Sequence, residues 1–274
     1  MSTDPGPPAQ RATGTVVPGW RAMWLRVEGH WAWYRRYWRS SLYSSGIEPL
    51  LFLAAMGLGF GSQVEAGPAT GGHSYLHYVT PALLVAGAVM SGMGESSFPV
   101  LSGFKWQKDY IAVTATPITP GQLLGGQLVW LGIRLTLSGV VYGLVALAFG
   151  AWLRHGAVLV VAVGVLAGLA CAAPVMALAA ATYDEGRRFI VMFRFVMVPI
   201  MLFSATFFPI DRIPIALRWL TWISPLWHGN ELARAAALGG GDPLAVAGHA
   251  AFLLVLFAGG VVLARRLFYR RLVV

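Results

Sequence analysis

Long apolar runs separated by short arginine-containing segments dominate the pattern of the chain. Each run is about 20 residues long, the length an α-helix needs to cross the hydrocarbon core of a membrane. The pattern therefore predicts an all-α integral membrane protein. Its six transmembrane helices are expected near residues 46–63, 76–96, 124–149, 157–181, 189–208 and 244–264.

A different periodicity precedes the first run. Between residues 20 and 39, aromatic side chains recur every three or four positions, and most of the arginines fall between them. Because tryptophan prefers the level of the lipid headgroups and arginine can reach lipid phosphate, this spacing predicts an amphipathic helix in the membrane interface. An ordinary aromatic core stripe is the alternative. The expected interface residues are Trp20, Trp24, Trp31, Tyr34 and Trp38.

The first 18 residues contain four prolines among small and polar residues. Such a segment has too little apolar surface to order itself, so residues 1–18 are expected to form a disordered cytoplasmic tail before a membrane domain over 19–274. No basic segment followed by an apolar core opens the chain, and we therefore expect no cleavable signal peptide.

Composition and charge sharpen this picture. The chain is 57% hydrophobic and 11% charged, whereas soluble domains are roughly a quarter charged, so a soluble enzyme is nearly excluded. The net charge of +9 is best explained by membrane orientation, because arginine-rich connections and both lysines fall on the N-terminal side of the predicted membrane. Both termini are therefore expected in the cytoplasm. The excess of arginine over lysine, of which Lys105 and Lys108 are the only examples, hints at a GC-rich bacterial genome.

Catalytic and nucleotide-binding motifs are missing from the sequence. No P-loop occurs, so we expect no ATP bound by this chain through such a loop. One cysteine and six scattered histidines predict no metal site. Ser224, His228 and Asp211 could be combined into a triad, but no nucleophile elbow supports it.

Ionisable residues within the predicted spans are candidates for the transport pathway. Arg134 lies well inside the third span, and Glu48 and Glu95 lie near the ends of the first and second. Arg134 could contact a polar substrate group, pair with Glu95 or Glu48, or extend to the membrane surface; we favour the two structural explanations over a substrate contact. Gly164 and Gly168 allow close helix packing, either within the chain or at a dimer seam.

Two C-terminal segments carry a family likeness. FSATFFPIDRIP, from Phe203 to Pro214, and SPLWHGNELARAAALG, from Ser224 to Gly239, closely resemble the C-terminal signature of type-2 ATP-binding-cassette (ABC) exporter permeases. TATPITPGQLLG, residues 114–125, resembles their connection between the second and third spans. IEPLL, residues 47–51, is similar to the start of the first span in the branch that includes lipooligosaccharide (nodulation-factor) and drug exporters. The likeness covers about residues 20–270.

The resemblance implies an architecture beyond the six spans. It implies that 20–39 form the interface helix, that a cytoplasmic coupling helix lies within about 97–112, and that re-entrant outer helices precede the sixth span. The outer signature residues are Pro225, His228, Glu231 and Arg234. Glu95 lies where relatives often have a glutamate, but Gly94 replaces a common aromatic.

The resemblance also implies partners. Two permeases, identical or related, would form the pathway, and each would bind a separate ATPase that carries ATP and Mg²⁺; this chain would bind no cofactor. Phe104, Trp106 and Tyr110 are expected to fill a groove on that ATPase, while Lys105, Lys108 and Asp109 fix its orientation.

The function implied is outward movement of an amphipathic or hydrophobic cargo, such as a lipid-linked glycan, a glycolipid or a drug-like molecule, from the cytoplasm or inner leaflet. Two alternatives stay open at this point. One is an ATP-independent transporter, and the other is an integral membrane enzyme that acts on lipid carriers.

Overall fold

A computed structural model describes residues 18–55, 59, 67, 70–152 and 156–273, without the side chains of 37–50 and 52. The described residues are helical with short connections and contain no strand. The expected tail 1–18 and the second half of the expected first span therefore lie almost entirely outside the described residues.

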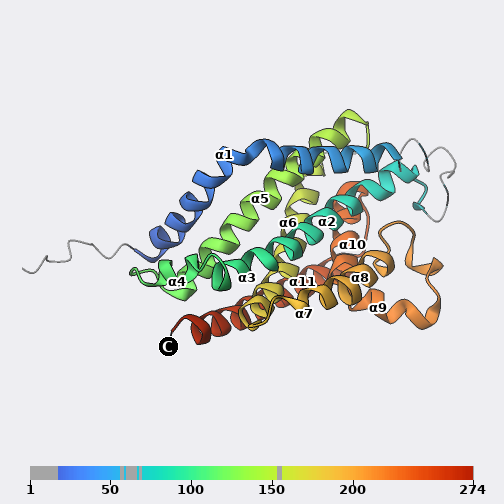
Figure 1. Ribbon diagram of the computed structural model, residues 1–274. Coiled ribbons are helices and arrows are strands. Elements are labelled where there is room, and N and C mark those ends of the chain that lie inside the picture. The colour runs from blue at the N-terminus through green and yellow to red at the C-terminus, as the bar shows by residue number, and fades with distance from the viewer. Residues whose placement is uncertain (1–17, 56–58, 60–66, 68–69, 153–155, 274) are drawn as a thin grey trace, which may run out of the picture.

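The first helix, α1, is longer than the sequence pattern predicted. It runs without interruption over Gly19–Ala54, so that the interface segment and the beginning of the first span form one element, which changes direction along its length (Figure 1). Residues 40–45 contain neither proline nor glycine, and nothing in this stretch stops the helix.

Within the described part of the chain, four helical segments are long and apolar enough to cross a membrane. They are α2 (Tyr75–Ser96) continued by α3 (Phe98–Lys105), α5 (Pro120–Ala148), α6 (Ala157–Ala180) and α11 (Pro243–Leu272). Their starts follow local chemistry. Thr119 forms a capping box with Gln122 before α5, and Asp242 caps α11. These elements match four of the six predicted spans.

The predicted span at 189–208 ends earlier than expected. Helical residues run through α7 (Arg187–Met192), a π-helical turn (Phe193–Met197) and α8 (Val198–Phe203). The helix stops at Phe203 because Ala205 has a φ of 52°. Side chains of later helices also donate hydrogen bonds to the carbonyl oxygens of Phe203, Ser204 and Thr206.

Helix α6 lies at the centre and packs against α2, α5, α10 (Pro225–Leu238) and α11, whereas α1 packs mainly against α5 (Figure 1). Glycines permit the close approach of α2 and α6. A β-carbon at Gly92 would lie 2.5 Å from the carbonyl oxygen of Gly168. Packing within the chain thus accounts for the Gly164 and Gly168 pattern.

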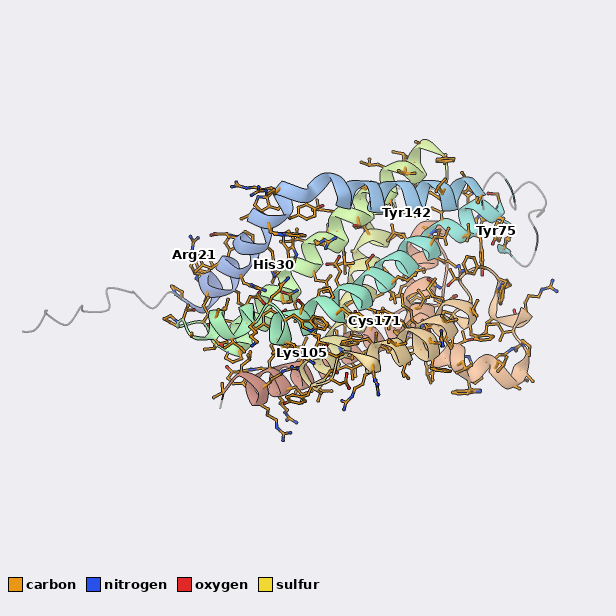
Figure 2. All side chains as sticks on the ribbon, viewed as in Figure 1. Arg21, His30, Tyr75, Lys105, Tyr142 and Cys171 are labelled. Atoms are coloured by element: carbon orange, nitrogen blue, oxygen red, sulfur yellow. The ribbon has the colours of Figure 1, made fainter. Side chains whose placement is uncertain are left out.

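The molecule has two chemically different ends. Arg21 and Lys105 lie toward one end and Tyr75 toward the other (Figure 2). The first end also contains α4 (Asp109–Thr114) and the C-terminal turns of α11, and the second contains α8 and α9 (Arg218–Trp222) (Figure 1). The arginine-rich segments expected on one side of the membrane do gather at the first end.

Candidate functional site

The segment expected to couple to an ATPase consists of α3, a bend and α4. Lys108 occupies the bend in a left-handed conformation, with φ at 56°, and its side chain is exposed. Lys105 pairs with Glu185 at 2.5 Å, and Trp106 donates its indole N–H to the same carboxylate at 3.2 Å. The Lys105 hydrogen bond lowers the pKa of Glu185 below its ordinary value. The bend is thus tied to the loop before α7.

Two of the aromatic residues expected to enter a groove on a partner are buried inside the chain. Phe104 and Tyr110 are 5% and 2% exposed, and their rings pack 4.9 Å apart and against Phe268 of α11. The groove-filling expectation is therefore wrong for these two rings, because long-range packing against α11 consumes their surface. Trp106 and Ile111, 49% and 52% exposed, are the large apolar side chains left on the outside of this segment.

An ion pair joins the coupling segment to α1. Arg26 contacts the carboxylate of Asp109 at 2.8 Å, and its guanidinium lies 5.3 Å from the centre of the Tyr110 ring. The Arg26 side chain is 14% exposed, so this pair is shielded more than an ordinary surface pair. Asp109 is also the first residue of α4, where a negative charge stabilises the helix.

Arg271 of α11 closes the same end of the molecule. Its guanidinium donates hydrogen bonds to the carbonyl oxygens of Ala179, Ala180 and Thr182, at 2.7 to 3.1 Å. It also lies 4.4 Å over the ring of Phe104. The arginine therefore satisfies the free carbonyl groups at the end of α6 and links α6, α11 and α3. We call residues 104–111 with Arg26, Glu185 and Arg271 the coupling platform.

The aromatic stripe on α1 divides between two environments. Trp20, Trp24 and Trp31 are 66%, 45% and 50% exposed. Tyr34 instead packs edge-on to Trp130 of α5. The side chain of Trp38 lies outside the described residues.

Beside this stripe, His30 forms a polar contact between α1 and α5. It stacks on Trp130, and its Nε2 lies 2.8 Å from the side-chain oxygen of Gln127. Burial and the neighbouring Arg26 lower the pKa of His30 to about 4. The imidazole is therefore neutral at physiological pH.

Arg134 of the predicted third span forms an ion pair with an acidic side chain of the second. Arg134 and Glu95 approach to 2.6 Å, and the guanidinium of Arg134 also lies 5.6 Å from the ring of Tyr34. Both charged side chains are about a quarter exposed, at 27% and 28%. The side chain of Glu48 lies outside the described residues.

The outer signature holds the loop after α8. Arg234 donates to the carbonyl oxygens of Ala205 and Thr206 and pairs with Glu231 at 3.1 Å. Asn230 donates to the carbonyl oxygen of Ser204. Because the side chain of Arg234 is only 9% exposed, it acts as a buried anchor for this loop.

The other two signature residues lie at the start of α10. Pro225 is in its first turn, where its missing N–H costs nothing. His228 stacks on Phe252 of α11, and its Nδ1 lies 2.7 Å from Nδ1 of His249. Among the described residues, no group of three or more histidine, cysteine or acidic residues could hold a metal ion.

The comparison with protein families decides the identity of this arrangement. A sequence model of the ABC-2 type transporter family matches residues 28–238, which include most of α1, the coupling platform's bend and the outer signature. The chain belongs to the ABC-2 type transporter family.

Proteins similar to this ABC-2 chain include three named nodulation protein J. The one from Rhizobium leguminosarum bv. trifolii is 28% identical over 82% of this chain and 85% of its own length. That from Rhizobium leguminosarum bv. viciae is 27% identical over 92% and 95%. That from Rhizobium meliloti (strain 1021) is 27% identical over 80% and 81%. The family resemblance inferred from the sequence is thus confirmed.

This ABC-2 chain is a membrane-embedded permease, the transport component of an ABC exporter, and not a catalytic enzyme. The family implies an ATP-binding partner, so the two alternatives of an ATP-independent transporter and a lipid-carrier enzyme are set aside.

Several contacts of the coupling platform could not be predicted from the sequence. Glu185 lies in a charged segment with Asp184, Arg187 and Arg188, and Arg26 and Arg271 lie in arginine-containing stretches. Each acquires its partner across 80 or more residues of chain: Arg26 to Asp109 spans 83, Lys105 to Glu185 spans 80 and Arg271 to Ala179 spans 92. No local pattern reports such a pairing.

Proposed function

We propose that this ABC-2 permease exports an amphipathic, glycolipid-like molecule, and that its ATPase docks on the coupling platform. The observation that carries the docking proposal is the pair of exposed apolar side chains, Trp106 and Ile111, on a platform whose other aromatic rings are buried. Binding hot spots are enriched in tryptophan, so Trp106 is the strongest candidate for an anchor. Lys105, Lys108 and Asp109 lie beside it and would orient the partner.

The proposed cargo follows from the wall that the spans present. Exposed side chains along α5 include Leu137, Val140 and Leu144, and the Arg134–Glu95 pair is internally neutralised. Such a surface accommodates an acyl chain better than an ion or a free sugar. The relatives named nodulation protein J and the likeness to lipooligosaccharide exporters support a lipid-linked glycan over a simple drug-like molecule.

We infer the following assembly and orientation. Two permeases, copies or relatives, each bind one ATPase, and the membrane domain over 19–274 lies in the bacterial inner membrane with both termini in the cytoplasm. The arginines gathered at the platform end support this orientation. Residues 1–18 would form a free tail, α1 would start in the interface, and the helices between α8 and α11 would enter the outer leaflet without crossing it.

The docking proposal is tested by removing its two exposed side chains. The double substitution Trp106→Ala and Ile111→Ala should reduce the ATPase that co-purifies with the permease at least tenfold, because hot-spot truncation costs about 2 kcal/mol or more. Trp222→Ala is the matched control, since Trp222 is 57% exposed at the opposite end. Quantitative mass spectrometry of the purified complex gives the ratio. Equal ATPase recovery from the double variant and the control would refute docking at this platform.

A further inference from the structure

A pocket of about 300 Å³ lies at the end of the molecule opposite the coupling platform. It forms where the segment before α2, the beginning of α2, the second half of α10 and the beginning of α11 meet. Its polar wall consists of Thr70, His73, Tyr78, Glu231, Arg234, Asp242 and His249. Its volume is at the lower limit of small-molecule pockets, which suits a headgroup better than a whole amphiphile.

The cation in this wall is already engaged. Arg234 donates to Glu231 and to two loop carbonyl groups, and its guanidinium lies 4.0 Å from the centre of the Tyr78 ring. Of its two other N–H groups, the one at Nε is buried and has no partner among the described residues. Arg234 is therefore a poor receptor for an anion, although it contributes to the wall.

The carboxylates keep free acceptor atoms. Glu231 uses one oxygen, Oε1, for Arg234, and no other described residue donates to it. Oδ1 of Asp242 accepts a hydrogen bond from the backbone N–H of Leu244, and Asp242 is exposed. Each carboxylate thus offers one oxygen to a hydrogen-bond donor.

His249 provides a third acceptor, because its contact with His228 fixes which of its ring nitrogens carries the proton. Nε2 of His228 lies 3.0 Å from the carbonyl oxygen of Trp222, which can only accept, so this nitrogen carries the proton. Neutral histidine, the main form above its ordinary pKa of about 6.5, then has an accepting Nδ1, and His249 must donate from its own Nδ1. The Nε2 of His249 is left as an acceptor.

Glycines keep the entrance open. Gly239, Gly240 and Gly241 join α10 to α11 with φ values of 77°, 89° and 94°, a conformation that side-chain-bearing residues rarely adopt. A β-carbon at Gly240 would meet no atom within 4 Å. The rim of the pocket is therefore bare backbone, and a ligand can approach the two carboxylates without displacing side chains.

We propose that this outer pocket binds a headgroup rich in hydrogen-bond donors, namely a sugar ring that carries hydroxyl and amino groups. Two carboxylate oxygens and one imidazole nitrogen match such donors, and they repel an anionic sugar. The inference rests on the proposed function in one respect, since the headgroup would belong to the exported amphiphile.

The test measures binding of glucosamine to the full chain with its ATPase in lipid nanodiscs, by saturation-transfer NMR. The expected result is millimolar binding, with glucuronate at least tenfold weaker. Asp242→Asn preserves the helix cap but removes the charge, and Ala245→Trp fills the pocket without removing a polar group. Both should weaken glucosamine binding at least tenfold, whereas Asp211→Asn, outside the pocket, should leave it unchanged.

Glucosamine binding that survives Ala245→Trp, or glucuronate binding of equal strength, would overturn the proposal. Recovery of the ATPase with each variant reports folding and assembly separately. Absence of any ATPase from the wild-type complex would refute the proposed function, whereas an assembled complex without pocket-dependent binding would refute only the headgroup site. Since Asp242→Asn and Ala245→Trp perturb the chain in different ways, one well-assembled variant is enough for the decision.

Discussion

Single residues decide how closely the two central helices can lie. At Gly168 of α6, an added β-carbon would lie 2.8 Å from the carbonyl oxygen of Ala88 and 2.7 Å from a methyl group of Leu135. The carbonyl oxygen belongs to α2 and cannot rotate away, so α2 and α6 would have to separate. Glycine is needed here for the distance between helices, not for an unusual backbone angle.

Replacing this glycine by a bulky residue should therefore destabilise the protein. Gly168→Leu is expected to cost about 1–3 kcal/mol through overpacking and to lower the melting temperature in detergent by several degrees. The matched control is Gly143→Ala in α5, where a β-carbon would meet no atom within 4 Å. Differential scanning fluorimetry compares the two. A Gly168→Leu protein that melts with the control would contradict the packing seen between α2 and α6.

His30 gives the α1–α5 contact a pH dependence. Its pKa is about 4 in the folded protein, below the ordinary value of 6.5, so the unfolded chain binds more protons below about pH 6.5. Stability should then be complete above that pH and decline as the pH falls toward 4. His30→Gln, which cannot titrate, should show a smaller fall in melting temperature between pH 7 and pH 4.5. His73→Gln is the control, and if it flattens the profile as much as His30→Gln does, His30 is not the source.

At the scale of helices, the coupling platform connects elements that the sequence order keeps apart. Arg26 joins α1 to α4, Lys105 and Trp106 join α3 to the loop before α7, and Arg271 joins α11 to α6. A displacement imposed on α4 by a docked partner would reach α1 through the Arg26–Asp109 pair and α11 through the Tyr110 and Phe268 rings. Under the proposed docking, the exposed part of the platform would contact the ATPase and its buried part would transmit the movement.

Removing the hydrogen bonds between Arg271 of α11 and the end of α6 should loosen that end of α6 without unfolding the protein. Arg271→Gln takes away the donor shared by three carbonyl groups, and deuterium uptake of peptides covering residues 176–190 should rise several-fold. Peptides at the beginning of α2 should be unaffected. Arg270→Gln, in the same helical turn but exposed, should exchange like the wild type. Identical uptake in the two variants would argue against the Arg271 contact.

The elements that could be predicted are those whose cause is local. The apolar runs predict α5, α6 and α11 closely, and Thr119 and Asp242 mark two of their starts. The early end at Phe203 was missed because it depends on Arg234 and Asn230, more than 20 residues later. The pairing of Arg134 with Glu95 was anticipated, since a charge within a span needs a partner.

The candidate site was only partly predictable for the same reason. Sequence placed the coupling segment and named Trp106, but it could not distinguish the exposed indole from the buried rings of Phe104 and Tyr110. That distinction comes from Phe268, over 150 residues away in the chain. Likewise, the outer pocket has no motif of its own, because its wall is assembled from α2, α10 and α11.

For the whole molecule, the two ends have opposite chemistry and are connected by α6. The platform end gathers arginines, whereas the pocket end offers carboxylates and bare glycine backbone. Between the two ends, most of the apolar surface of α5 and α11 is exposed in the single chain. In the most apolar stretch of each helix, 28% of the residues of α5 and 11% of those of α11 are buried. Lipid or a second permease must cover this surface, which agrees with the proposed paired assembly.

The Arg271 contact also has a consequence for biosynthesis. The end of α6 leaves the ribosome about ninety residues before the arginine that satisfies its carbonyl groups. Until then, water alone can bond to these carbonyls, which is possible only while that end of the helix stays at the aqueous surface. Closure of the platform must therefore be among the last steps of insertion. A nascent chain stalled before α11 would present an unfinished docking surface, and premature recruitment of the ATPase would be disfavoured without any dedicated chaperone.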